Sequence, residues 1–220
     1  MAPPPGYPKR PAVSGREMQR ATPIGALLAG GRSRRMGQPK ATMELAGRPL
    51  AWWAARSLAA VADTPVQVGG PPLPDLGWPC WPDLRSHEGP AAGLETALAR
   101  ARSAVVTSAI DTPFISPALL RRALRAVRNG ALAAVPHWRD RWHPLCAAYA
   151  PDMLVRLRDW LDAGNTDLQG LLRQTPVWRL GTATLLAFGD PDLLLLNVNG
   201  RDDLAWAEAA LASGLYQDKP

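Results

Sequence analysis

Cysteine, lysine, histidine and phenylalanine are scarce in this sequence, and long apolar runs are absent from it. Its 220 residues include two cysteines, Cys80 and Cys146, which lack the close spacing of a zinc site and cannot form a disulfide framework. We therefore expect a reducing, cytoplasmic environment. No window of ~18 residues is continuously apolar, so we expect neither a membrane-spanning helix nor a membrane partner.

The positive charge is confined to two short segments of the chain. The net charge is +6, and only three of the 25 basic residues are lysines. Residues 1–20 carry a net charge of +3 and residues 31–40 carry +4, whereas the remainder sums to −1. A surface that binds nucleic acid spreads its basic residues over a face or stripe. We therefore expect no nucleic-acid partner and interpret residues 31–40 as a local counter-charge.

The first 21 residues are rich in proline and lack the apolar core that a signal peptide requires. We predict a flexible tail over residues 1–21, a single domain over residues 22–214 and a second short tail over residues 215–220. Translation from Met18 is an alternative interpretation of the first segment.

Short apolar runs alternate with amphipathic stretches from Ile24 onward. This alternation predicts an α/β fold with a mostly parallel central sheet and helices on both of its faces. We predict strands over residues 24–29, 65–68, 104–110, 132–135, 144–150, 177–180 and 193–198, and helices over residues 49–62, 90–102, 116–129, 151–162, 166–173 and 202–211.

Polar residues of unusual type follow three of the predicted strands, after Ala29, Ile110 and Val198. In open α/β sheets, ligands bind in the loops at the carboxyl ends of the strands. The positions of these loops therefore predict one common site.

The loop after the first strand reads LLAGGRSRRMGQPK and ends at Lys40. Glycines let a backbone approach a phosphate closely, and Arg35 and Lys40 supply positive charge. The loop does not match a P-loop, because five residues separate Gly31 from Gly37, and the dinucleotide fingerprint GxGxxG is also absent. A solvated basic turn is the alternative interpretation of this segment.

The pattern LAGGxSRRMGxxK resembles the signature of nucleotidyltransferases of the molybdenum cofactor guanylyltransferase (MobA) type. Four further segments resemble motifs of that family in the same order: WPDLRSHEGPAAGL around Asp83, IDTP at 110–113, WHPLCAAY at 142–149 and NVN at 197–199. The resemblance covers roughly residues 24–211. It implies a Rossmann-like three-layer nucleotidyltransferase fold.

The resemblance also implies roles for individual residues. The catalytic group would comprise Lys40, Arg35 and Asp111, with Asp111 also holding Mg²⁺, which prefers carboxylate and phosphate oxygens. The nucleotide would be bound by Leu28, Ala29, Gly30, Gly31, Lys40, Asp83, Gly89, Gly93 and Asp111. For Asp111 a helix cap or turn is the alternative role, and for Asp83 a surface loop position.

Three residues near the end of the pattern are assigned to the second substrate or to the positioning of a loop: Asn197, Asn199 and His143. We do not assign His143 as a general base, because a phosphate nucleophile is already ionised near pH 7. Two departures from the family pattern stand out. Gly69 occupies a position where the family commonly has an asparagine that contacts the nucleotide, and Gly200-Arg201 replaces Thr-Pro.

The reaction implied by the resemblance is the transfer of GMP from GTP to the phosphate of molybdopterin or Mo-molybdopterin, with release of pyrophosphate. Other proteins of molybdenum cofactor biosynthesis and the molybdoenzymes are the partners it implies. Alternatives are a related transferase that uses CTP on molybdopterin or a nucleoside triphosphate on a sugar phosphate. A homologue that binds nucleotide or cofactor without catalysis is a further alternative.

Overall fold

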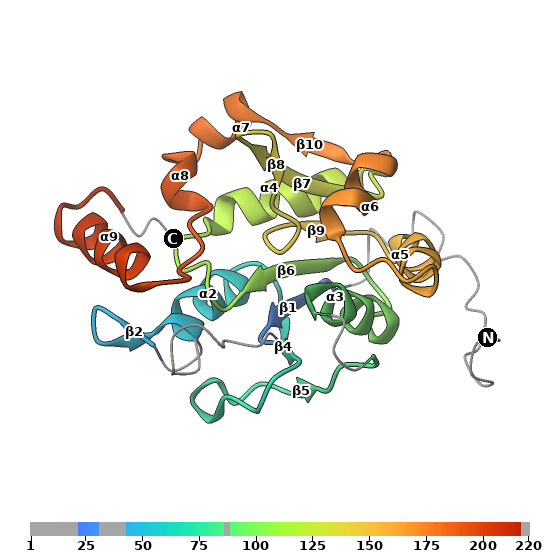
Figure 1. Cartoon of the computed structure of the whole chain (residues 1–220), viewed down its shortest axis with the longest axis horizontal. Helices are drawn as coiled ribbons and strands as arrows, with labels where there is room; N and C mark the ends of the chain where they lie inside the picture. Colours follow the sequence, from blue (N-terminus) through green and yellow to red (C-terminus); the bar gives the residue numbers. More distant parts are fainter. Residues whose placement is uncertain (1–21, 31–42, 86–88, 217–220) are drawn as a thin grey trace.

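A mixed central sheet organises this computed structural model, which describes residues 22–30, 43–85 and 89–216 (Figure 1). In spatial order its strands are β10 (Trp178–Leu180), β7 (Ala133–Trp138), β9 (Ala148–Tyr149), β6 (Val105–Ala109), β1 (Ile24–Leu28), β4 (Thr64–Val68) and β5 (Cys80–Trp81), and β8 (Arg141–Trp142) pairs with β7. Neighbouring strands are parallel except where β9 pairs with β6 and β7, and where β8 pairs with β7.

Helices cover both faces of this sheet. Helices α2 (Leu50–Ala59) and α4 (Pro117–Arg128) lie on one face, and α3 (Gly89–Arg100), α5 (Met153–Asp162) and α6 (Leu168–Gln174) lie on the other. Successive residues of β1 point to opposite faces, so Leu27 packs with the α2 and α4 side while Ala26 and Leu28 pack with the α3 and α5 side. The predicted three-layer α/β fold is therefore confirmed.

A smaller third core lies beside the sheet. It is formed by the hairpin β2 (Glu44–Leu45) and β3 (Arg48–Pro49), by α9 (Arg201–Ala212) and by buried side chains such as Phe114 and Val198. Figure 1 shows α9 next to this hairpin, at the same end of the molecule. Tyr216, within the predicted C-terminal tail, packs against Phe114 with ring centroids 4.7 Å apart.

The predicted strand over residues 193–198 is wrong. A short helix α8 (Pro191–Leu194), which follows α7 (Thr182–Leu186), includes its first two residues, and residues 195–199 have no regular structure. Asp190 Oδ1 accepts a hydrogen bond from the backbone N–H of Asp192, and Pro191 stands at the first helical position. These are helix-start signals, and they override the apolar run that suggested a strand.

The predicted strand over residues 144–150 is too long. Only β9, at its end, is strand, and a turn precedes it in which Cys146 N donates to His143 O at 3.1 Å. His143 therefore lies in a connection between strands. Residue Pro144 has no N–H to offer a strand ladder, which accounts for the shortened strand.

Arg139 and Asp140 form the two-residue turn between β7 and β8, and both have left-handed backbones with φ of 48° and 57°. Such hairpin turns need positive φ at both positions, a conformation that a Cβ atom makes unfavourable. We expect Asp140→Gly to raise the free energy of unfolding by about 1 kcal/mol in urea denaturation. Asp140→Ala is the control, because it removes the carboxylate but keeps the Cβ; an equal gain in that variant would contradict the backbone explanation.

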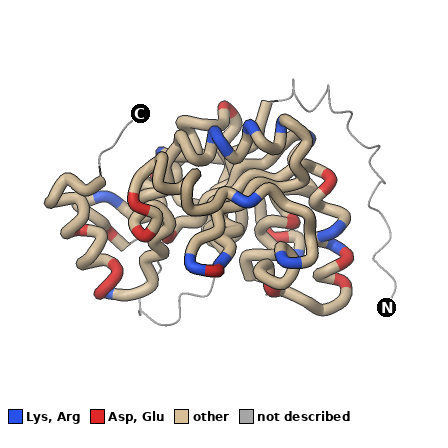
Figure 2. Tube along the Cα trace, turned by 90° about the horizontal axis from the view of Figure 1, so that it is seen from above, with Lys and Arg blue, Asp and Glu red and all other residues tan. Residues whose placement is uncertain are grey.

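Charges of both signs are interspersed along the described part of the chain (Figure 2). There, arginines and acidic residues occur in equal number, so their formal charges cancel. Within the same part, none of the helices combines the length and apolar character needed to cross a membrane. The predicted tail over residues 1–21 and the basic segment 31–40 lie outside the described residues.

Candidate active site

The carboxyl ends of three parallel strands meet at one edge of the sheet. Leu28 of β1 is in register with Val68 of β4 and with Ala109 of β6. The alignment continues past the strands, since Ala29 N donates to Val68 O at 2.8 Å and Ile110 N donates to Leu28 O at 3.3 Å. The loops after β1, β4 and β6 therefore leave the sheet side by side.

The carboxylate of Asp83 is seated among glycines of this edge. A Cβ atom at Gly30 would lie 3.1 Å from Asp83 Oδ2, and one at Gly69 would lie 2.8 Å from the same oxygen. A Cβ atom at Gly93 would lie 3.7 Å from Asp83 Oδ1. Side chains at these positions would crowd the carboxylate or fill its surroundings. We call the space bounded by Gly30, Gly69 and Gly93 the glycine seat.

Asp83 as a whole residue is exposed, but its carboxyl group is partly desolvated. Partial burial raises the pKa of this carboxyl above its ordinary value. Among the described residues, none donates a hydrogen bond to the carboxylate. An acceptor in this state is suited to a ligand that brings its own N–H or O–H donors.

Other predicted nucleotide-binding residues surround the same seat. Leu28 lies against Gly93 at 3.4 Å, measured from its Cδ2 to a Cβ position at the glycine. Gly89 begins α3 with a left-handed φ of 63°. The carbonyl oxygen of Ala29 lies 2.6 Å from the Cβ position of Gly70, another left-handed glycine. The strand end, the Gly69-Gly70 turn and the start of α3 thus share one surface.

Asp111 is half-buried and lies in the turn that directly follows β6, the position that the turn alternative predicts. Its backbone oxygen accepts a hydrogen bond from Val198 N at 2.8 Å, which brings residues 197–199 to the same edge. The cap of the next helix, α4, is Ser116, whose Oγ accepts from Leu119 N. The cap role considered for Asp111 therefore belongs to another residue.

The described residues contain no cluster of three or more histidine, cysteine or acidic side chains that could enclose a metal ion. Mg²⁺ does not need such a cage, because it is commonly held by one or two carboxylates together with substrate phosphates and water. Asp111, at the sheet edge beside the glycine seat, fits that pattern. The residues present are thus compatible with a magnesium ion that arrives with a triphosphate.

A cavity of about 280 Å³ contains two of the residues assigned to the second substrate, His143 and Asn197. Pro90, in the first turn of α3, also lines it, three residues before Gly93 of the glycine seat on the same helix. Asn199 is directed differently: its Nδ2 donates to Asn197 O at 3.0 Å, and its N–H donates to Asp203 Oδ2. Asn197 thus faces the cavity and Asn199 braces the loop.

The departure at Gly200 has a structural role. Gly200 is the N-cap of α9, and its N–H donates to Asp203 Oδ2 at 2.9 Å. The same carboxylate oxygen accepts from the N–H of Asn199 at 2.7 Å. The loop that carries the two asparagines is therefore held without the Thr-Pro pair of the family pattern.

The pKa of His143 is lowered to about 4, first by burial and then by the positive charge of Arg141. At pH 7 the imidazole is therefore neutral in the folded protein. The unfolded chain binds this proton near pH 6.5, so the folded state loses stability as the pH falls from 6.5 to 4. We expect the free energy of unfolding to drop by roughly 2 kcal/mol over this window.

Urea denaturation at several pH values tests this expectation, with His143→Gln as the informative variant. The substitution should flatten the dependence between pH 6.5 and 4. His137→Gln is the matched control, because the pKa of His137 is lowered in the same direction but its ring is much less buried. A larger flattening in the control than in His143→Gln would refute the assignment.

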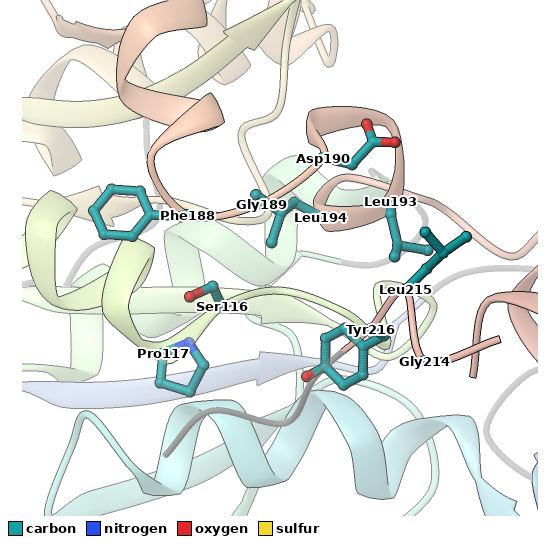
Figure 3. A pocket seen from close by; sticks show the side chains of 10 residues that line it. All are labelled: Ser116, Pro117, Phe188, Gly189, Asp190, Leu193, Leu194, Gly214, Leu215 and Tyr216. Atoms are coloured by element: carbon teal, nitrogen blue, oxygen red, sulfur yellow. The ribbon is translucent and has the colours of Figure 1, made fainter. Parts of the chain in front are cut away.

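Figure 3 shows a second cavity, of about 360 Å³, which has no lining residue in common with the glycine seat. It is bounded by the start of α4, by the connection between α7 and α8, and by the segment after α9. Its lining residues are Ser116, Pro117, Phe188, Gly189, Asp190, Leu193, Leu194, Gly214, Leu215 and Tyr216. Of the predicted site residues that the structure describes, none lines this cavity.

Three of the predicted site residues, Gly31, Arg35 and Lys40, lie outside the described residues.

The structure adds one residue, Gln67, that was not predicted from the sequence. Gln67 is buried within β4, and its Nε2 donates to Gly69 O at 2.9 Å and to Pro71 O at 2.7 Å. The sequence feature that could have indicated this role is a polar residue inside an apolar strand. Gln67 holds the turn that forms one wall of the glycine seat.

A family model described as a MobA-like NTP transferase domain matches residues 25–178. The molybdenum cofactor guanylyltransferase of Cereibacter sphaeroides is 36% identical, covering 86% of this chain and 96% of that protein. The one of Desulfosudis oleivorans is 31% identical with the same coverage. The crystal structure of molybdopterin-guanine dinucleotide biosynthesis protein A from Archaeoglobus fulgidus superposes with a TM-score of 0.74, at 26% identity, over 86% of this chain and 99% of that one. With relatives this similar over most of its length, the chain belongs to the MobA-like NTP transferase family of nucleotidyltransferase enzymes, together with the molybdenum cofactor guanylyltransferases.

Proposed function

We propose that this enzyme transfers GMP from GTP to the terminal phosphate of molybdopterin, with or without molybdenum bound. A phosphate oxygen of molybdopterin attacks the α-phosphorus of GTP, and the bond from this phosphorus to the bridging oxygen of the β-phosphate breaks. The products are the guanine dinucleotide form of the cofactor and pyrophosphate. The observation that carries the proposal is the glycine seat around Asp83, at the same sheet edge as Asp111, in a chain of this family.

The guanosine end of GTP would occupy the glycine seat. Asp83 would accept hydrogen bonds from donors of the nucleoside, and the backbone of Leu28, Ala29 and Gly30 would face its edge. A site built around an unpaired acceptor discriminates strongly, because a nucleotide without a matching donor leaves the acceptor unsatisfied. Gly89 and Gly93 keep the start of α3 free of side chains at this surface.

The triphosphate would extend toward Asp111. Arg35 and Lys40 would neutralise the phosphate oxygens, and Asp111 would hold Mg²⁺. When bound, Mg²⁺ supplies positive charge to the phosphates as the α-phosphorus is attacked. Catalysis of this kind depends on positioning and on charge neutralisation at the transferred phosphorus.

Molybdopterin would enter through the cavity lined by His143 and Asn197. No general base is required, since a phosphate monoester is ionised near neutral pH. The low pKa of His143 agrees with this, because a group that is neutral and weakly basic at pH 7 is suited to orienting a substrate. Asn199 would keep the loop of Asn197 in place.

We further propose that residues 22–214 act as one catalytic domain and that the reaction takes place in the cytoplasm. Both described cysteines, Cys80 and Cys146, are free thiols, as is common in proteins of reducing compartments. The partners expected from this function are other proteins of molybdenum cofactor biosynthesis and the molybdoenzymes that receive the product.

Turnover with GTP, Mg²⁺ and molybdopterin tests the proposed function, with the product mass and the released pyrophosphate as readouts. A product with the mass of the guanine dinucleotide is the expected result. Parallel reactions with CTP and UTP, and calorimetric titrations of all three nucleotides, test the choice of base. Equal affinities, or a product formed from CTP alone, would overturn the assignment of GTP.

A further inference from the structure

We propose that Glu95, in the middle of α3, is a positioning residue that holds Asp83 in the glycine seat by way of Arg85. The proposal rests on the proposed function to the extent that Asp83 is taken there as a nucleotide-binding group. It concerns a side chain that lies within the protein and does not itself line the seat.

Glu95 is a buried carboxylate with an arginine on each of its oxygens. The residue is 3% exposed. Its Oε2 accepts from Arg85 Nε at 2.8 Å, and its Oε1 accepts from Arg158 Nε at 2.9 Å. Hydrogen bonds between two charged groups are the stronger ones, and a buried charge that loses a partner is costly. The position of Arg85 is therefore closely tied to α3.

A second anchor fixes the residue between Asp83 and Arg85. Leu84 N donates to Thr96 Oγ1 at 2.9 Å, and Thr96 Oγ1 donates to Ala92 O at 2.9 Å. Two consecutive residues after Asp83 are thus bound to two consecutive residues of α3. The backbone that carries Asp83 has little freedom to move relative to this helix.

The same helix forms one wall of the glycine seat, since Gly93 lies two residues before Glu95. The carboxylate of Asp83 has no hydrogen-bond donor of its own among the described residues. The position of this carboxylate in the glycine seat therefore depends on the hydrogen bonds that Leu84 and Arg85 form with α3. Arg85 Nη2 extends these anchors to Asp162 Oδ1 of α5, at 2.6 Å, where α3 and α5 pack together (Figure 1).

The test measures the Kd of GTP by calorimetry, and KM and kcat with molybdopterin, for the full chain and for Glu95→Gln. Loss of a charge-assisted anchor should raise both Kd and KM for GTP about tenfold, with kcat at saturating GTP within about twofold of the original. In an Asp83→Asn background the same substitution should no longer change the Kd, because the two residues act in series.

Arg158→Gln is the matched control, since it removes the other arginine partner of Glu95, which belongs to α5 and not to the segment Asp83–Arg85. It should lower Tm and leave the Kd of GTP unchanged. Should Glu95→Gln fail to fold, Arg85→Gln takes its place, because Arg85 is only half-buried and carries the link to the loop.

Three results would overturn the proposal: an unchanged Kd in Glu95→Gln or its substitute, the same loss of affinity in Arg158→Gln, or a full effect that persists in the Asp83→Asn background. If the original chain prefers CTP or UTP, the proposed function fails. The Kd of Glu95→Gln relative to that of the original chain, measured with the preferred nucleotide, then still tests whether Glu95 positions Asp83. If the original chain binds none of the three nucleotides, both proposals are overturned.

Discussion

Replacement of Asp111 by alanine is expected to lower the turnover of GTP with molybdopterin about 100-fold or more. Asp111 lies at the sheet edge where the loops after β1 and β6 meet, and its backbone joins the loop of Asn197 through Val198. In the proposed mechanism, removal of this carboxylate takes away the residue that would hold Mg²⁺ beside the phosphates, and with it positive charge at the α-phosphorus. The release of pyrophosphate, measured over a range of Mg²⁺ concentrations, gives the effect.

Two further variants define the origin of this loss. Asp111→Asn keeps the size of the side chain and removes only its charge, so it should lose nearly as much turnover and should need more Mg²⁺ for the remainder. Asp202→Asn is the control, because Asp202 is an exposed carboxylate in the first turn of α9. It should stay within about twofold of the original turnover, since exposed helix charges contribute weakly. Full Mg²⁺-dependent pyrophosphate release by Asp111→Ala would remove the residue from the mechanism.

The substitution Gly69→Asn is expected to raise the Kd of GTP at least about tenfold, although it introduces the residue that the family pattern commonly has there. Gly69 has a left-handed φ of 70°, and a Cβ atom would lie 2.8 Å from Asp83 Oδ2 and 3.1 Å from the Cα of Gly30. The new side chain would push Asp83 out of the glycine seat. A displaced anchor group and a strained backbone together account for a loss of this size.

Gly77→Asn is a closely matched control for this experiment. Gly77 also has a left-handed φ, of 61°, but an added Cβ atom would meet nothing within 4 Å. Its substitution should therefore leave the Kd of GTP unchanged and cost only the backbone strain that both variants share. Tighter binding of GTP by Gly69→Asn would mean that an asparagine adds a contact and that Asp83 does not depend on the space beside it.

The order of strands and helices could be predicted because the sequence features that indicate each element lie within that element or next to it. Apolar runs such as residues 24–28, and helix starts such as Ser116-Pro117, carry their own periodicity and caps. The prediction was wrong for residues 193–198, where a run of leucines suits a strand and a buried helix equally. There, Asp190 as a cap and Pro191 at the first helical position decided the outcome.

The candidate site was predictable in part for a different reason. Loops at the carboxyl ends of parallel strands converge on one edge, so Gly30 and Asp111 could be placed together from their positions after apolar strands. Gln67, Glu95 and Thr96 could not be placed in this way. Each is a polar residue within a buried stretch, and its partner depends on which loop the fold brings next to it.

By itself, the sequence determined the alternation of strands and helices, the convergence of the loops after β1 and β6 at one edge of the sheet, and the family motifs that point to nucleotidyl transfer. Only the tertiary structure decided that Gly30, Gly69 and Gly93 enclose the carboxylate of Asp83, and that Gly69 leaves room for it. The physical reason is that these four residues come from separate segments, and their approach depends on parallel register and on the packing of α3. Such distances arise from the whole fold, whereas periodicity, caps and turns are encoded within a few residues.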